Sequence, residues 1–154
     1  MKLEDLFEAA VVAQLDLRAP EVFSSGTSVR ETVARMREQL RTVALIENGG
    51  QVIGVFTEVD YARKVLGRDI NEETAIDNFM TEKPTTVRRD TALSRCFELM
   101  SEGNFRQLPV VDENGKPSGV VTIRHLVQYL ADRYPSEILA MAPNVHQITE
   151  VDGG

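Results

Sequence analysis

The stretches GVFTEVDYARK, residues 54–64, and GVVTIRHLVQY, residues 119–129, decide the fold class of this chain. Each begins with glycine, two apolar residues and a threonine, which is typical of a strand that turns into a helix. Three positions after the threonine, the first stretch has Asp60 and the second has His125. Because the same motif occurs twice, an internal repeat is indicated. The motif also raises the question of why the carboxylate is present only once.

The repeat extends well upstream of this motif. Gly54 and Gly119 lie 65 positions apart, whereas Met36 and Met100 lie 64 apart. The change of offset places one additional residue of the second copy near Gly103. Further pairs obey one offset or the other: Pro20 with Pro84, Thr27 with Thr91, Arg41 with Arg106, and Thr57 with Thr122. The chain therefore contains two copies of one unit.

Each copy predicts the order strand, helix, strand, strand, helix. The opening strands are expected at 21–23 and 85–87, each after a proline. Ser28 is the expected cap of the first helix in copy one, and Asp90 or Thr91 takes this place in copy two. Apolar residues at helical spacing follow the caps: Val29, Val33, Met36 and Leu40 in copy one, and Leu93, Phe97 and Met100 in copy two.

Turn residues connect the two inner strands of each copy. The segments ENGGQ (47–51) and DENGK (112–116) carry the chemistry of β-hairpin turns. The fold class is therefore α/β, in the mixed α+β sense. We expect two βαββα repeats, related by a pseudo-two-fold axis, that pack sheet face to sheet face and share one core. The expected division is an N-terminal helix with repeat one (1–72), repeat two (73–133) and a C-terminal helix or tail (134–154).

Two segments lie outside the repeats. Residues 4–15 predict an additional amphipathic helix. In the tail, Pro135 suits the first turn of a helix. The apolar residues that follow need a cover, which the body of the domain or a second subunit would provide: Ile138, Leu139, Met141 and Ile148. This apolar tail is compatible with a homodimer.

Composition and charge limit the function classes. The 154 residues are 42% hydrophobic and 27% charged, as in ordinary globular proteins. A net charge of −7 argues against a nucleic-acid groove. No apolar run approaches the length of a membrane span, and the N-terminus lacks the basic start of a signal peptide. Cys96 is the only cysteine, which fits a cytoplasmic protein, and we expect it in the core.

Thr57 and Asp60 admit two interpretations. Thr57 lies where a strand turns into a helix, so its hydroxyl and the free N–H groups of the first turn suit an anion such as phosphate. Asp60, in the same turn, repels phosphate but suits the two hydroxyls of a ribose. Alternatively, Thr-x-x-Asp is only a helix cap, worth about 0.5–2 kcal/mol. The motif alone leaves both interpretations open.

Longer segments resemble a known family. The segments FRQLPVVDENGKPSGVVTIRHL (105–126), LIENGGQVIGVFTEVD (45–60) and DNFMTEKPTTV (77–87) resemble the CBS domain, which is named after cystathionine beta-synthase. The tandem pair of such domains is called a Bateman module, and the resemblance covers about residues 17–130. It implies a stand-alone, non-catalytic regulatory module. Such modules bind an adenosine-type ligand (AMP, ADP, ATP, NAD or S-adenosylmethionine) in the cleft between the repeats, need no obligatory cofactor and usually form dimers.

Carried residue by residue onto this chain, the family pattern implies one intact site. Thr57 and Asp60 of copy one would hold ribose and phosphate, and Arg124 could reach the phosphate. Copy two would supply the contacts to the base: Lys83, Thr85, Thr86, Arg106, Gln107, Leu108 and Pro109.

A second site departs from the pattern. It would pair Thr122 and His125 with residues of copy one: Pro20, Glu21, Val22, Arg41, Thr42 and Val43. A neutral imidazole accepts only one hydrogen bond. Loss of a charge-assisted hydrogen bond costs roughly 1.5–3 kcal/mol, or about 10- to 100-fold in affinity. We therefore predict one competent nucleoside site and a second, weaker one.

Other candidate sites receive little support from the sequence. His125 and His146 have no further metal ligand at helical spacing, so no metal site is predicted. Five basic residues could form a basic face: Arg35, Arg37, Arg41, Arg63 and Lys64. We expect most of them to be solvated, with Arg41 as the exception because Arg106 repeats it.

Three functions remain open at this point. The first is a regulatory nucleotide-binding module that signals to an unknown partner protein, expected to be a separate chain. The second is a dimerisation or scaffold module with a vestigial ligand site. The third is an enzyme acting on a nucleotide phosphate, which the sequence disfavours because it shows no nucleophile with a base, no Walker-type loop and no metal cluster.

Overall fold

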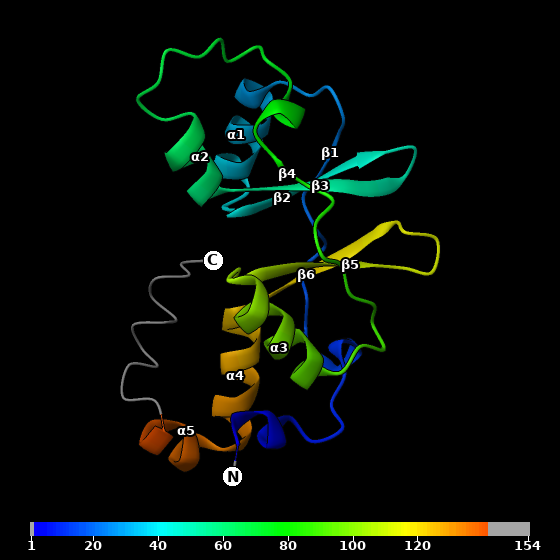
Figure 1. Cartoon of the computed structure of the whole chain (residues 1–154), viewed down its shortest axis with the longest axis vertical. Helices are drawn as coiled ribbons and strands as arrows, with labels where there is room; N and C mark the ends of the chain where they lie inside the picture. Colours follow the sequence, from blue (N-terminus) through cyan, green and yellow to red (C-terminus); the bar gives the residue numbers. More distant parts are fainter. Residues whose placement is uncertain (1, 142–154) are drawn as a thin grey trace.

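The computed structural model describes residues 2–141, and its elements follow the repeated order (Figure 1). Copy one contains β1 (Val22–Ser24), α1 (Val29–Glu38), β2 (Val43–Asn48), β3 (Gln51–Thr57) and α2 (Glu58–Lys64). Copy two contains α3 (Leu93–Gly103), β5 (Gln107–Val111), β6 (Pro117–Thr122) and α4 (Ile123–Arg133). The remaining elements are η1 (Leu3–Phe7), η2 (Val12–Gln14), η3 (Ile76–Asn78), β4 (Thr81–Glu82) and α5 (Pro135–Met141). The predicted fold class is confirmed.

Each copy is built on its own small sheet. In copy one the strand order is β1-β2-β3-β4, with β1 parallel to β2 and the other neighbours antiparallel. In copy two β5 and β6 form an antiparallel pair. The strand expected at 85–87 is reduced to one parallel bridge between Val87 and Val110. Both hairpins are present where the turns predict them, and Gly50 and Gly115 take the left-handed backbone conformation there.

The segment in front of each copy packs against the other copy. Val11 forms an antiparallel bridge with Ala92, and Ala75 forms one with Ser28. These bridges are pseudo-symmetric mates, since the partners differ by the same offset (75 − 11 = 64 and 92 − 28 = 64). The two repeats therefore exchange their leading segments around the pseudo-two-fold axis.

This exchange explains why the predicted helix at 4–15 is wrong. The segment forms two short 3₁₀ helices, η1 and η2, instead of one amphipathic α-helix. Ala10 O accepts a hydrogen bond from Leu93 N–H, and Val12 N–H donates to Thr91 O, each at 2.9 Å. Because these backbone groups pair with copy two, they are not available for an α-helix of their own.

The predicted cap of α3 is also wrong. The N-cap residue is Ala92, which has no side-chain cap, and neither Asp90 nor Thr91 takes this role. The Thr91 hydroxyl instead accepts from Arg88 N–H at 2.9 Å. Since the leading segment already accepts the first amide of α3, a side-chain cap is not needed there. In copy one Ser28 does cap α1, and its hydroxyl accepts from Glu31 N–H at 3.1 Å.

Leu40 does not belong to the apolar face of α1. The helix ends at Glu38, and Leu40 follows with a left-handed backbone (φ 54°) and 82% of its surface exposed. The expected face is otherwise present, because Val29 and Met36 are buried in the core of copy one. The helical period thus predicted the face correctly but extended it one turn too far.

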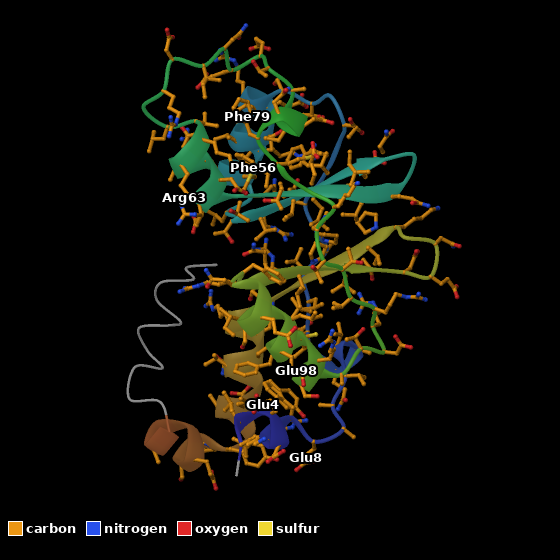
Figure 2. All side chains as sticks on the ribbon, viewed as in Figure 1. Glu4, Glu8, Phe56, Arg63, Phe79 and Glu98 are labelled. Carbon is orange, nitrogen blue, oxygen red and sulfur yellow. The ribbon has the colours of Figure 1, made fainter. Side chains whose placement is uncertain are left out.

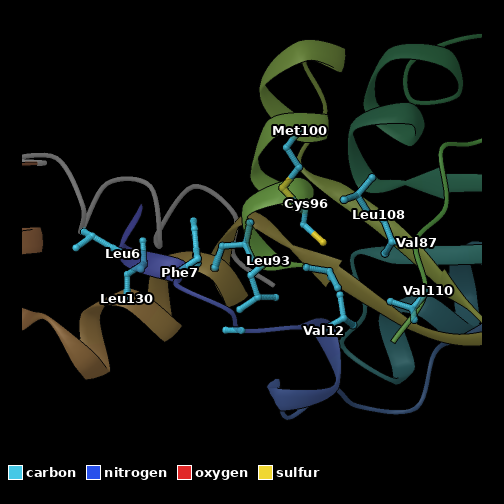
Figure 3. Packing of buried hydrophobic residues seen from close by; sticks show 13 residues of the cluster. Leu6, Phe7, Val12, Val87, Leu93, Cys96, Met100, Leu108, Val110 and Leu130 are labelled. Carbon is cyan, nitrogen blue, oxygen red and sulfur yellow. The ribbon is translucent and has the colours of Figure 1, made fainter. Parts of the chain in front are cut away.

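The described residues, 2–141, form two hydrophobic cores, so the expectation of one shared core is wrong. The core of copy two contains Phe7 of the leading segment together with Leu93, Cys96 and Met100 of α3 (Figure 3). The core of copy one contains Phe56 of β3 and Ile76 of the segment that leads into copy two, with Phe79 and Met80 partly buried against it. Each pair of helices covers the outer face of its own sheet, which separates the cores (Figure 1).

The inner faces of the two sheets meet between these cores. Strand β2 contacts β6, and β3 contacts β5. At the hairpin tips Val52 N–H donates to Gly115 O at 3.2 Å, which links the two sheets directly. The prediction that the copies pack sheet to sheet is therefore confirmed, and any cleft between the copies must lie along this junction.

The residue that follows α4 contacts the leading segment. Pro135 begins α5, as predicted, and the Tyr134 hydroxyl donates to the Glu8 carboxylate at 2.7 Å. His146 and Ile148, and the side chains of Ile138, Leu139 and Met141, lie outside what the structure describes. Within residues 2–141, every helix is too short or too polar to cross a lipid bilayer.

Candidate functional site

A cavity of about 540 Å³ lies between the two copies, within the range of sites that hold small ligands. Copy one contributes the end of β3, the start of α2 and the start of β2 with the residue before it. Copy two contributes the start of β5 with the residues before it and the end of β6. The lining residues are Thr42, Val43, Thr57, Glu58, Val59, Asp60, Arg63, Thr81, Asn104, Phe105, Arg106, Gln107 and Thr122.

Thr57 and Asp60 form a helix cap at one wall of this cavity. Thr57 N–H donates to Asp60 Oδ2 at 2.9 Å, and Asp60 N–H donates to Thr57 Oγ1 at 3.3 Å. The capping interpretation is therefore correct. Two amides of the first turn of α2 therefore already have partners, because Asp60 N–H donates to Thr57 and Glu58 N–H donates to Thr42 O at 3.1 Å.

Capping does not use the whole carboxylate of Asp60. The cap engages Oδ2, while Oδ1 lies 3.4 Å from Lys64 Nζ. The Asp60 side chain keeps 16% of its surface exposed and lines the cavity. An ionised carboxylate has about four acceptor positions, so acceptor capacity remains for a ligand. The two interpretations of the motif are thus compatible: the cap orients a carboxylate that a diol can still reach.

The other lining residues separate into charged and apolar groups. Arg63 of α2 (Figure 2) and Arg106 before β5 are the two cations, and Glu58 is a second acid beside Asp60. Val43, Val59 and Phe105 provide apolar surface. This arrangement offers flat apolar contact, a hydrogen-bond acceptor and guanidinium donors in one cavity, which are the groups that a base, a sugar and a phosphate require.

The structure places the predicted base-contacting residues at different depths. Arg106 and Gln107 line the cavity with Thr57 and Asp60. Leu108 is fully buried in the core of copy two, where it pairs with Val121 of β6, and it does not line the cavity. The remaining members of the predicted set do not line the cavity: Lys83, Thr85, Thr86, Pro109 and Arg124.

Several lining residues were not predicted from the sequence. Phe105 directly precedes Arg106, which corresponds to Arg41 in the other copy. An aromatic residue at this position could have been predicted to line the cavity. Arg63 lies one helical turn after Asp60, which the spacing could have indicated. Asn104 and Thr81 gave no such signal, because the left-handed end of α3 and the pairing of β4 with the other copy bring them to the cavity.

The second predicted site coincides with a smaller cavity of about 90 Å³. It is lined by Arg18, Pro20, Leu40, Arg41, Thr42, Val43, Val120, Thr122 and His125. Two predicted members are absent from this lining. The Glu21 carboxylate pairs with Arg35 Nε at 2.8 Å, and Val22 pairs with Leu45 in the sheet.

His125 caps α4 just as Asp60 caps α2. Thr122 N–H donates to His125 Nδ1 at 3.0 Å, and His125 N–H donates to Thr122 Oγ1 at 3.3 Å. Since Nδ1 accepts a backbone proton, the ring proton is on Nε2. Burial and the nearby charge of Arg124 lower the pKa of His125, while Asp16 partly opposes this shift. The ring therefore presents a donor where copy one presents a carboxylate.

The remaining candidates are structural. Arg35 makes structural contacts: its guanidinium lies 3.9 Å from the Phe23 ring centre, and its Nε pairs with the Glu21 carboxylate at 2.8 Å. Cys96 is buried, and desolvation raises the pKa of its thiol to about 11, which keeps it protonated. Among residues 2–141, no group of three or more His, Cys, Asp or Glu side chains is placed to hold a metal ion.

Comparison with known proteins gives a family for this architecture. The CBS domain model matches residues 12–67 and 76–132. The chain belongs to the CBS-domain family. An uncharacterized 17.7 kDa protein of Acidianus ambivalens is 30% identical over 125 residues, which are 80% of this chain and 75% of that protein. A Methanopyrus kandleri protein is 32% identical over 100 residues, and these cover 64% of this chain but only 51% of that protein.

Solved structures show the same tandem fold. A CBS domain pair in complex with 5′-methylthioadenosine and S-adenosyl-L-methionine has a TM-score of 0.72 at 21% identity, and the match covers 81% of this chain and 98% of that one. The protein CBSX2 in complex with AMP has a TM-score of 0.65 at 25% identity, with 79% and 96% covered. These matches confirm the tandem CBS pair. The family match indicates no enzymatic family.

Proposed function

We propose that this CBS pair is a non-catalytic regulatory module that binds one adenosine-type ligand in the larger cavity. The observation that carries the proposal is the position of Asp60. Its carboxylate is oriented by the cap, retains acceptor capacity and lines a ligand-sized cavity bordered by both copies. The complexes of related pairs with AMP and with S-adenosyl-L-methionine support the adenosyl class.

The lining residues suggest how such a ligand would lie. The ribose hydroxyls would donate to Asp60, because a carboxylate only accepts hydrogen bonds. The base would pack on the apolar surface of Val43 and Phe105, with polar contacts to backbone groups near Gln107. A phosphate would extend away from Asp60 and Glu58 towards Arg63 and Arg106, since the acids repel it and the guanidinium groups bind it in a fork.

Ligand binding in this position can serve regulation. The cavity walls come from both copies, so a ligand that contacts both favours arrangements in which they lie close together. A ligand shifts such an equilibrium only by its difference in affinity for the two arrangements. A cytoplasmic homodimer whose packing is sensed by a partner protein is part of this proposal.

The direct test compares thermal stability with and without adenine nucleotides. Bound ligand raises the melting temperature by mass action. We expect AMP, ATP, NAD or S-adenosylmethionine to stabilise the protein, and Asp60→Asn to weaken the effective ligand about 10- to 100-fold. Asn keeps an acceptor for Thr57 N–H, so the cap survives. Asp90→Asn, in an exposed loop, is the matched control.

A scaffold function without a ligand is the alternative outcome of the same test. If none of the four nucleotides shifts the melting temperature at millimolar concentration, the ligand proposal is wrong. If Asp60→Asn and Asp90→Asn respond equally to a stabilising nucleotide, the ligand does not use the carboxylate of Asp60.

A further inference from the structure

The smaller cavity has a different chemical character from the larger one. Its volume of about 90 Å³ is well below the several hundred Å³ of sites that hold drug-sized ligands. It has room for a small polyatomic ion or a few water molecules. The lining residues include the cations Arg18 and Arg41 and the donor His125, whereas no carboxylate is among them.

Arg41 is only partly satisfied by the protein. Its Nη2 donates to Ala19 O at 2.6 Å, while its Nε is buried and has no hydrogen-bond partner among the described residues. Neither Arg41 nor Arg18 forms an ion pair with a carboxylate within residues 2–141. A buried polar atom without a partner is unusual and calls for an explanation such as a bound ion. A guanidinium with a free edge is the usual protein donor to oxyanions.

His125 adds a third donor to this wall. Its only acceptor, Nδ1, is used by the helix cap, so the free nitrogen of the ring is the protonated Nε2. The Thr122 hydroxyl lies 3.0 Å from the same Nδ1 and completes the polar surface. The lining residues therefore include the donors that an oxyanion requires and no carboxylate that could accept from a ribose.

We propose that the small cavity binds a free oxyanion of the sulfate or phosphate class through Arg18, Arg41 and His125. The two cavities share Thr42, Val43 and Thr122 as wall residues, so the anion would lie next to the larger cavity without filling it. Copy two has His125 at the position that corresponds to Asp60. Its cavity would then bind an oxyanion, and not a second nucleoside with lower affinity. This inference does not depend on the proposed nucleotide function.

Sulfate is the probe for a first experiment, at constant ionic strength set with chloride. We expect sulfate to produce saturable shifts of the His125 ring resonances in NMR spectra of the full chain. Arg41→Gln should weaken sulfate binding about 10- to 100-fold, since it removes a charge-assisted donor. Arg18→Gln, at an exposed side chain, is the second variant and should weaken it in the same direction without affecting the fold. Arg95→Gln on α3 is the control and should have no effect.

Two results of this experiment would overturn the proposal. One is a response that does not saturate, or that chloride reproduces. The other is equal sulfate affinity in Arg41→Gln, Arg18→Gln and Arg95→Gln.

A second experiment separates a free anion from the phosphate of a nucleotide in the larger cavity. We expect sulfate to bind with unchanged affinity, within about threefold, when AMP is present, and Asp60→Asn to leave sulfate binding intact. Competition between sulfate and AMP would contradict a separate site. Because Asp60→Asn is expected to weaken AMP and spare sulfate, failure of the nucleotide proposal and failure of the anion proposal are distinguishable.

Discussion

The two copies use the same helix cap to support different chemistry. Thr57 with Asp60 and Thr122 with His125 make matching pairs of hydrogen bonds, at 2.9 and 3.3 Å in copy one and 3.0 and 3.3 Å in copy two. A carboxylate and an imidazole thus cap equally well in geometry. The cap explains why the third residue of both α2 and α4 has a side-chain acceptor. It does not explain why this residue is an aspartate in one copy and a histidine in the other. The difference lies in what each group leaves for the cavity: acceptor capacity at Asp60, and a donor at His125.

The largest loss of stability that we predict comes from substitutions in the exchanged leading segments of the two copies. Phe7 is fully buried in the core of copy two, and Ile76 is fully buried in the core of copy one. We expect Phe7→Ala to lower the free energy of unfolding by about 3–5 kcal/mol and Ile76→Ala by about 2–5 kcal/mol. Urea unfolding measures both. A loss below 1 kcal/mol for Phe7→Ala would mean that the N-terminal segment is not part of the core.

The caps themselves should contribute equally to stability. Thr57→Ala and Thr122→Ala each remove the hydroxyl that accepts the amide of the third helical residue. Each substitution should cost about 0.5–2 kcal/mol, and the two values should agree within about 0.5 kcal/mol. Chemical denaturation of the two variants provides the comparison. A cost confined to Thr57 would show that the caps are not equivalent.

The smallest expected effect is the pH dependence that only copy two should show. The pKa of His125 in the folded protein lies below its unfolded value of 6.5, because burial and Arg124 disfavour the charged ring. The unfolded chain therefore binds a proton more readily, and stability is lost as the pH falls below about 6.5 through the folded pKa. His125→Asn keeps a neutral acceptor for the cap and should flatten this dependence.

The control for this pH dependence is His146→Asn, which changes the other histidine of the chain. The free energy of unfolding is measured between pH 5 and pH 7.5, a range that brackets the usual histidine pKa of about 6.5. If His125→Asn and the unmodified protein lose the same stability on acidification, His125 is not responsible for the loss.

The sequence predicted those parts of the fold that depend on local chemistry. Three features were located correctly: the Asn-Gly turns, the apolar runs of the strands and the cap at the Thr-x-x-Asp motif. Each of these features is formed by residues that are close together in the sequence. The helix expected at 4–15 and the cap expected at Asp90 or Thr91 were wrong. In both cases the backbone bonds of the segment go to the other copy, and no local pattern reports such a partner.

The site was predicted in the same uneven way. Thr57, Asp60, Arg106 and Gln107 line one cavity, and Thr122, His125 and Arg41 line the other. Arg18 and Leu40 were not predicted to line a cavity. Leu40 was assigned to a helix face by its spacing, but α1 ends before it and leaves it at the small cavity. Residues that line a cavity only because the two copies pack together can be identified from the three-dimensional structure but not from the sequence.

The central claim is that Asp60 binds the hydroxyls of a ribose in the larger cavity. Isothermal titration of AMP and 2′-deoxy-AMP into the unmodified protein and into Asp60→Asn tests this contact directly. We predict one site per chain, with AMP binding about 10- to 100-fold more tightly than 2′-deoxy-AMP. In Asp60→Asn this ratio should fall to near one, because the substitution and the missing hydroxyl remove the same hydrogen bond. An unchanged ratio in Asp60→Asn, or two equal AMP sites per chain, would contradict the account.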